Sequence, residues 1–123
     1  LPMAAMKPLE ERFLTYRRSL EMVVACEEVA RHLPAFRRDL IDQLRRASSS
    51  VSLNIAEGAE EFSPKEKLRI YRIARRSAQE SIAILDVADR VIPAGPDTLR
   101  ARNLLNEVLG LLTNTSIALE SRK

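Results

Sequence analysis

Five polar side chains recur at spacings of 3, 4, 4 and 3 residues in the middle of this 123-residue chain. They are Gln43, Arg46, Ser50, Asn54 and Glu57. On a helix of 3.6 residues per turn these spacings give one polar row beside an apolar face. Amide, guanidinium, hydroxyl and carboxylate groups in one row could bind a small polar ligand. The same groups could instead bond to one another and to neighbouring helices, fixing the packing register.

The rest of the sequence offers little chemistry to support a ligand pocket. His32 is the only histidine, and no Gly-rich phosphate loop, nucleophile elbow or zinc motif is present. We therefore predict no catalytic site, no metal and no cofactor, and favour the structural interpretation of the polar row. An enzyme built on Glu27, Arg46, Asn54 and Glu57 is the weakest alternative.

Two further residues have ordinary explanations. Cys26 is the only cysteine, so no internal disulfide can form, which fits a reducing cytoplasm. We interpret it as a small buried residue rather than a nucleophile. Glu27 falls within an apolar stripe, where a carboxylate needs a partner. We expect it at a helix edge or paired with an arginine from another helix.

The charge composition points to polyanions. The chain carries 20 basic and 17 acidic residues, a net charge of +3 and a sequence pI near 9.4, and 16 of its basic residues are arginine. Arginine presents a planar fork that suits phosphate. The candidate phosphate contacts are Lys65, Arg69, Arg72 and Arg76, which fall in line on one predicted helix, with Arg37, Arg38 and Arg45 as further candidates. The alternative is an ordinary solvated surface with ion pairs such as Arg38–Asp42.

Helical periodicity places these residues on four helices, over residues 12–32, 35–57, 64–91 and 98–120, after a flexible tail over residues 1–11. Gly58 suits a C-terminal cap of the second helix. Ser63-Pro64-Lys65-Glu66 is a capping box that starts the third. Strand signals and membrane-length apolar runs are missing from the sequence. The pattern predicts an all-α, antiparallel up-down-up-down four-helix bundle.

The last two predicted helices carry more apolar surface than one bundle core requires. On residues 64–91 two adjacent apolar stripes cover roughly half the circumference. On residues 98–120 a seam of coiled-coil spacing has a flanking apolar row, and Gly110 would allow a close helix approach. Surplus apolar surface on a small helical protein usually lies in an interface, so we predict a homo-oligomer.

Residues 43–58 resemble the signature of a bacterial four-helix-bundle family first noted as reading frames within intervening sequences of large-subunit ribosomal RNA genes. That signature reads Gln-Leu-Arg-Arg-Ala, then Ser-Ile or Ser-Val, then Asn-Ile-Ala-Glu-Gly. It stands here as residues 43–47, 50–51 and 54–58. A second family block is matched by Ser63, Lys65, Glu66, Ile73, Ala74, Ser77 and Glu80. The family often has glycine where this chain has Arg76.

The resemblance implies an up-down bundle that commonly assembles as a pentamer with a central channel. A group similar in fold, the accessory variability determinants of diversity-generating retroelements, binds a reverse transcriptase and nucleic acid. The resemblance therefore favours a non-enzymatic, cytoplasmic, pentameric scaffold that binds RNA, DNA or a nucleoprotein partner such as a reverse transcriptase. The alternative is a protein-binding adaptor with no nucleic-acid affinity.

Overall fold

A computed structural model describes residues 7–121 and confirms an all-α bundle. Its long helices are α2 (Leu14–His32), α3 (Arg38–Ala59), α4 (Pro64–Val91) and α5 (Leu99–Glu120). A short α1 (Leu9–Arg12) precedes them, and a 3₁₀ turn, η2 (Ala35–Arg37), leads into α3. Within the described part of the chain there is no strand.

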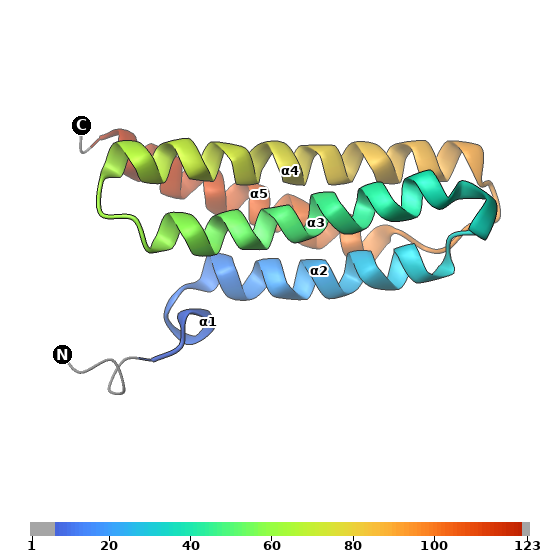
Figure 1. The fold of residues 1–123 in the computed structure, drawn as a ribbon, viewed down its shortest axis with the longest axis horizontal. Coiled ribbons are helices and arrows are strands. Elements are labelled where there is room, and N and C mark those ends of the chain that lie inside the picture. The colour runs from blue at the N-terminus through green and yellow to red at the C-terminus, as the bar shows by residue number, and fades with distance from the viewer. Residues whose placement is uncertain (1–6, 122–123) are drawn as a thin grey trace.

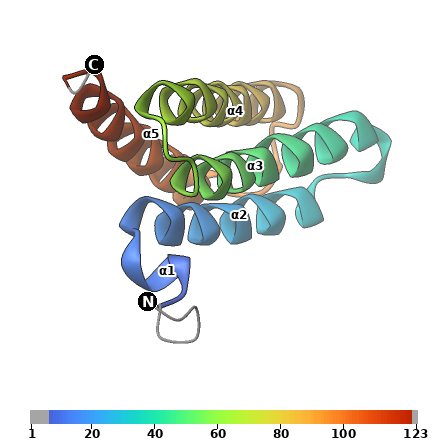
Figure 2. The same ribbon diagram turned by 60° about the vertical axis from the view of Figure 1, so that its left-hand side comes forward.

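The long helices run alternately up and down, each packing on its neighbours in the sequence (Figure 1). α3 lies between α2 and α4, and α5 closes the bundle by packing on both α4 and α2. The α3–α4 connection and the end of α5 lie at one end of the bundle, and the α2–α3 and α4–α5 connections lie at the other (Figures 1 and 2). The start of α4 is therefore close to the end of α5.

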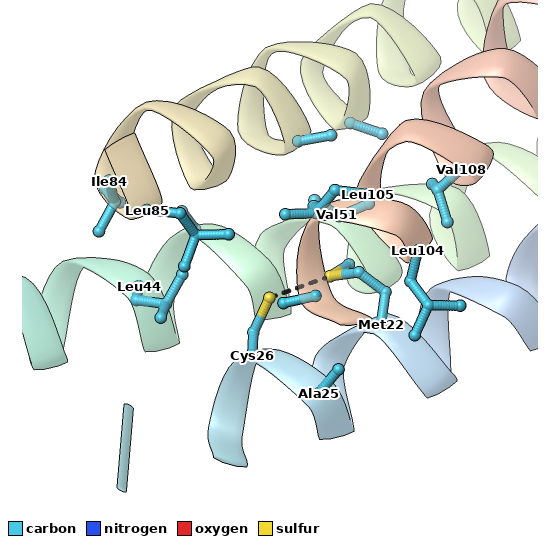
Figure 3. Close-up of a cluster of buried hydrophobic side chains, with 14 of the residues drawn as sticks. Met22, Ala25, Cys26, Leu44, Val51, Ile84, Leu85, Leu104, Leu105 and Val108 are labelled. Atoms are coloured by element: carbon cyan, nitrogen blue, oxygen red, sulfur yellow. Dashed lines mark hydrogen bonds between the residues drawn. The ribbon is translucent and has the colours of Figure 1, made fainter. Parts of the chain in front are cut away.

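The core is aliphatic, as a chain with no tryptophan and three phenylalanines requires. Every long helix contributes side chains with no exposed surface, including Met22, Leu44, Leu85 and Leu105. Figure 3 shows this cluster, with Cys26 beside Met22 at a sulfur–sulfur distance of 3.6 Å. Cys26 is fully buried, which confirms its interpretation as a core residue.

The first helix differs from its predicted form. The expected helix over residues 12–32 is split at Phe13, whose backbone is extended, and residues 9–12 form a separate helical turn, of which residues 9–11 lie in the predicted tail. The break lets the half-buried Phe13 ring approach Tyr71 of α4, with ring centroids 6.5 Å apart. Arg12 of the extra turn pairs with Glu60 at 3.3 Å. Residues 1–6 of the predicted tail lie outside the described residues.

Gly58 does not act as the predicted left-handed cap. No described glycine has a positive φ, and α3 continues through Gly58 to Ala59. The residue is small because Tyr71 packs against it: a Cβ at this position would lie 2.5 Å from Tyr71 Cε1. The predicted cap of α4 is present, since Ser63 Oγ accepts from the Glu66 backbone N–H at 3.4 Å.

Most of the surplus apolar surface on α4 is used within the chain. Ile70, Ile84 and Ala88 of its second stripe are at most 5% exposed, because α4 packs on α3 as well as on α5. Gly110 faces open space, so it makes no close helix approach within the chain. Large exposed apolar side chains are instead spread over several elements, with Val24, Leu53, Phe62 and Ile117 all more than 60% exposed.

Candidate nucleic-acid interface

The first sixteen residues of α4, 64–79, carry the strongest concentration of positive charge in the chain. Six are basic and one is acidic; they are Lys65, Lys67, Arg69, Arg72, Arg75 and Arg76 against Glu66. The second half of the helix, 80–91, has three acidic residues and one basic residue. The basic half contains the N-terminal end of α4, whose helix dipole adds positive potential.

Lys65, Arg69, Arg72 and Arg76 are exposed and follow one side of α4; we call them the basic row. The eleven residue-to-residue steps from Lys65 to Arg76 give the row a length of about 16 Å. Arg69 pairs with Glu66 at 2.8 Å, and Arg72 pairs with Glu120 of α5 at 3.0 Å. Lys65 and Arg76 form no ion pair with any described residue. The row is thus partly neutralised.

Electrostatic surroundings also differ along the row. The hydrogen bond to Glu66 is the main cause that raises the pKa of Arg69, with further attraction from Glu66, Glu57 and Glu61. These carboxylates gather at the α3–α4 connection. Arg76 lies almost two turns further along α4, beyond this acidic cluster, so the positive end of the row is its C-terminal half.

Lys67 has a structural task. Its ammonium group donates to the backbone carbonyls of Gly58 and Ala59, both at 3.0 Å. These carbonyls end α3 and have no partner within that helix. A cation at this position also complements the negative end of the α3 dipole. Lys67 therefore joins α3 to α4 and does not belong to the basic row.

The stretch of α5 that precedes Glu120 carries no charge. From Val108 to Leu119 the sequence has no acidic or basic residue, and it includes the polar run Thr113-Asn114-Thr115-Ser116. Arg75, which is not among the predicted phosphate contacts, is half-buried on α4, and its Nε has no hydrogen-bond partner among residues 7–121. Only its place in a doublet with Arg76 could have drawn attention to it.

The other predicted phosphate contacts lie elsewhere. Arg37 pairs with Asp39 at 2.9 Å and Arg38 with Asp42 at 3.1 Å, near the start of α3. That is the opposite end of the bundle from the start of α4 (Figure 1). Arg45 pairs with Glu27 of α2 at 2.7 Å. The structure thus brings four of the seven predicted residues into one row and separates the other three from it.

The Arg45–Glu27 pair confirms the expectation that Glu27 is held by an arginine from another helix. It also separates Glu27 from the remaining residues of the weak enzyme alternative, because Asn54 lies on the opposite flank of α3, toward α4. Among the described residues, no group of three or more His, Cys, Asp or Glu side chains could hold a metal ion. Burial raises the pKa of the Cys26 thiol to about 12, which disfavours a thiolate.

The polar row of α3 divides into two parts. Asn54 donates to the backbone oxygen of Ser50 at 2.8 Å and to its hydroxyl at 3.0 Å, and Ser77 of α4 donates to the same hydroxyl at 2.9 Å. This centre links two helices, as the structural interpretation expects. Gln43, Arg46 and Glu57 are exposed instead, and no described residue forms a hydrogen bond or ion pair with their side chains.

Comparison with known proteins places this geometry in a family. The model of the 23S rRNA-intervening sequence protein family matches residues 11–114, which include the polar row, the basic row and all but the end of α5. The chain belongs to this family. A search of curated proteins finds no match.

A solved structure supports the fold of this family member. It is a protein of unknown function from the S23 ribosomal protein family of Bacteroides thetaiotaomicron, with a TM-score of 0.73 and 21% sequence identity. The match covers 83% of this chain and 97% of that one. At this identity the likeness establishes the fold alone.

No helix in the described part of the chain is long and apolar enough to cross a membrane.

Proposed function

We propose that this family member is a non-enzymatic, homo-oligomeric helical scaffold that binds the phosphate backbone of RNA or DNA through the basic row of α4. One observation carries the proposal: residues 64–79 hold six basic residues and one acidic residue. Such contacts would be made to phosphates and would therefore tolerate different sequences.

The ion pairs of the basic row are compatible with phosphate binding. The side chains of Arg69 and Arg72 are 62% and 53% exposed. Exposed pairs of this kind contribute about 0–1 kcal/mol and weaken with salt, so a phosphate can replace the carboxylate. A row of about 16 Å matches the rise of roughly five base pairs along the axis of a duplex.

Assembly would multiply a weak contact. One basic row offers four cations, but several copies on one particle would bind a polyanion with greatly increased effective concentration. The exposed ends of the polar row, Gln43, Arg46 and Glu57, together with exposed Leu53 on the same helix, are candidate contacts between copies. The pentamer implied by the family resemblance is the expected state.

Light scattering with a short RNA or DNA duplex at two salt concentrations tests both the homo-oligomeric state and the nucleic-acid binding. We expect a particle of several chains that gains mass with duplex at low salt and loses it at high salt. The logarithm of the binding constant should fall with the logarithm of salt with a slope of about −2 to −4, for two to four phosphates. A particle indifferent to duplex at both salts would contradict the proposal and favour the adaptor with a protein partner.

Variants locate the contact. Changing Arg69, Arg72 and Arg76 together to Gln should abolish duplex binding without placing new carboxylates beside Glu66 and Glu120. The matched control changes three exposed arginines on other surfaces, Arg31, Arg90 and Arg100, to Gln and alters the net charge equally. Equal affinity of the two triple variants would show that overall charge, and not the basic row, is responsible. If the partner is a reverse transcriptase, as the resemblance to the retroelement proteins implies, the enzyme should bind the wild-type protein and should not bind the variant that lacks Arg69, Arg72 and Arg76.

A further inference from the structure

The structure contains two buried side-chain polar atoms without hydrogen-bond partners among the described residues: Arg75 Nε and Ser116 Oγ. Ser116 is only 7% exposed. Buried polar atoms are nearly always paired, because leaving one unpaired costs its full desolvation energy. Both exceptions lie on helices that pack together, α4 and α5, and both can donate a hydrogen bond.

Ion pairs across the α4–α5 interface give the register of the two helices, and this register puts Arg75 and Ser116 at about the same level. Arg72 of α4 pairs with Glu120 of α5 at 3.0 Å, and Arg102 of α5 pairs with Asp86 and Asp89 of α4 at 2.8 and 2.7 Å. The helices are antiparallel, so one turn onward from Arg72 corresponds to one turn back from Glu120. Those steps lead to Arg75 and Ser116.

The chemistry of this level favours an anion. A guanidinium has five N–H donors and no acceptor, and no described residue accepts from Arg75. Arg72 and Arg76 add positive charge beside it, whereas α5 supplies no charge between Val108 and Leu119. Thr113 lies one turn before Ser116 and could add a third donor. An oxyanion with several acceptor atoms would satisfy donors from both helices.

We propose that Arg75 and Ser116 form a phosphate-binding site at the α4–α5 interface. The assignment of this phosphate to a nucleic-acid backbone rests on the proposed function; free inorganic phosphate presents the same oxygens. The site adjoins the basic row, so a strand following the row could place one phosphate between the two helices. Charge-assisted bonds from an arginine fork would make it the most specific contact of the interface.

Thermal unfolding with inorganic phosphate replacing chloride at constant ionic strength tests the site. Exclusion of phosphate from protein surfaces raises the Tm of any protein, so the wild type must be compared with variants. We expect a saturable extra rise in Tm for the wild type. It should disappear in Ser116→Ala and in Arg75→Gln, and Arg75→Lys should restore only part of it because it retains charge without the planar fork.

Two controls keep the test decisive. Arg90→Gln removes a charge from the exposed far half of α4 and should respond to phosphate like the wild type. Ser116→Ala removes a hydroxyl that has no partner, so its Tm in chloride should equal or exceed that of the wild type. The same phosphate response in the wild type, Ser116→Ala and Arg75→Gln would overturn the proposal.

Duplex binding separates this site from the proposed function. Weaker duplex binding by Ser116→Ala, with intact binding by Arg90→Gln, would support a backbone phosphate in the site. Loss of the phosphate response with unchanged duplex affinity would support the site and assign it to free phosphate. If phosphate stabilises the wild type through these residues but no duplex binds, only the proposed function fails.

Discussion

Replacement of Gly58 by alanine tests whether this glycine is a site of close helix packing or a helix cap. A Cβ at this position would lie 2.5 Å from Tyr71 Cε1 and 2.8 Å from Cδ1. Tyr71 is 2% exposed, so its ring cannot move aside freely. Such overpacking costs about 1–3 kcal/mol. Against this stands a gain in helix propensity of up to about 1 kcal/mol.

The net expectation for Gly58→Ala is therefore a loss of about 1–2 kcal/mol in the free energy of unfolding. Gly110→Ala is the matched control because Gly110 lies inside α5, is exposed and has no atom within 4 Å of an added Cβ. It should gain about 0.5–1 kcal/mol. The two variants share one chemical change and should move stability in opposite directions.

Urea unfolding followed by circular dichroism, at one fixed protein concentration, measures both variants. Gly58 is the penultimate residue of α3, so its propensity gain is smaller than that of Gly110 by a few tenths of a kcal/mol. If the unfolding free energies of the two variants differ by more than these few tenths, the additional difference measures the steric contact with Tyr71. In a Tyr71→Leu background, which removes Cε1 and Cζ, the penalty should shrink. Equal stabilisation by both alanines would refute the packing argument.

Three further predictions concern single contacts. The pKa of the Cys26 thiol is about 12 in the folded protein and 9.0 ordinarily, so its contribution to stability should be full below pH 9 and should be lost as the pH rises toward 12. Because the thiol is buried, a thiol reagent should label Cys26 only at the rate of unfolding. Ser63→Ala should cost about 1 kcal/mol in unfolding free energy through loss of the α4 cap, and Ser63→Asp should restore it. Arg45→Ala should lower the unfolding free energy by less than about 1 kcal/mol, since both side chains of the Arg45–Glu27 pair are more than one-third exposed. The same variant should bind duplex as tightly as the wild type. Weaker duplex binding would show that Arg45 contributes to the nucleic-acid interface.

Local rules predicted the bundle well because its signals act within one helix. The limits of α4 coincide with the predicted range 64–91, since Ser63 and Pro64 define its start. The sequence-based predictions failed where contact with a residue far away in the sequence determines the local structure. Phe13 interrupts the first helix to reach Tyr71, and Gly58 is small because of that same ring. Sequence periodicity contains no information about a side chain on another helix.

In the candidate site, too, the features set within one helix were predictable from the sequence, and those set by packing between helices were not. Helical spacing alone aligned Lys65 with Arg76 along α4. It could not reveal that Arg45 pairs with Glu27 of α2, or that the register of α4 and α5 puts Arg75 and Ser116 at about one level, because both depend on how the helices pack. Ion pairs such as Arg72–Glu120 establish that register, and they are visible only in three dimensions.

The net charge of +3 understates the electrostatic asymmetry of this protein. Residues 64–79 have a charge of +5, six basic minus one acidic, so the remainder of the chain is slightly negative. Carboxylates meet this charge in the first half and at the centre of the stretch, where Glu66 pairs with Arg69 and Glu120 pairs with Arg72, while α5 carries no charge from Val108 to Leu119. A uniform basic surface would bind polyanions in many orientations. A basic half-helix with an uncharged, hydroxyl-bearing neighbour would direct phosphate to the α4–α5 side, where we propose that Arg75 and Ser116 donate to it.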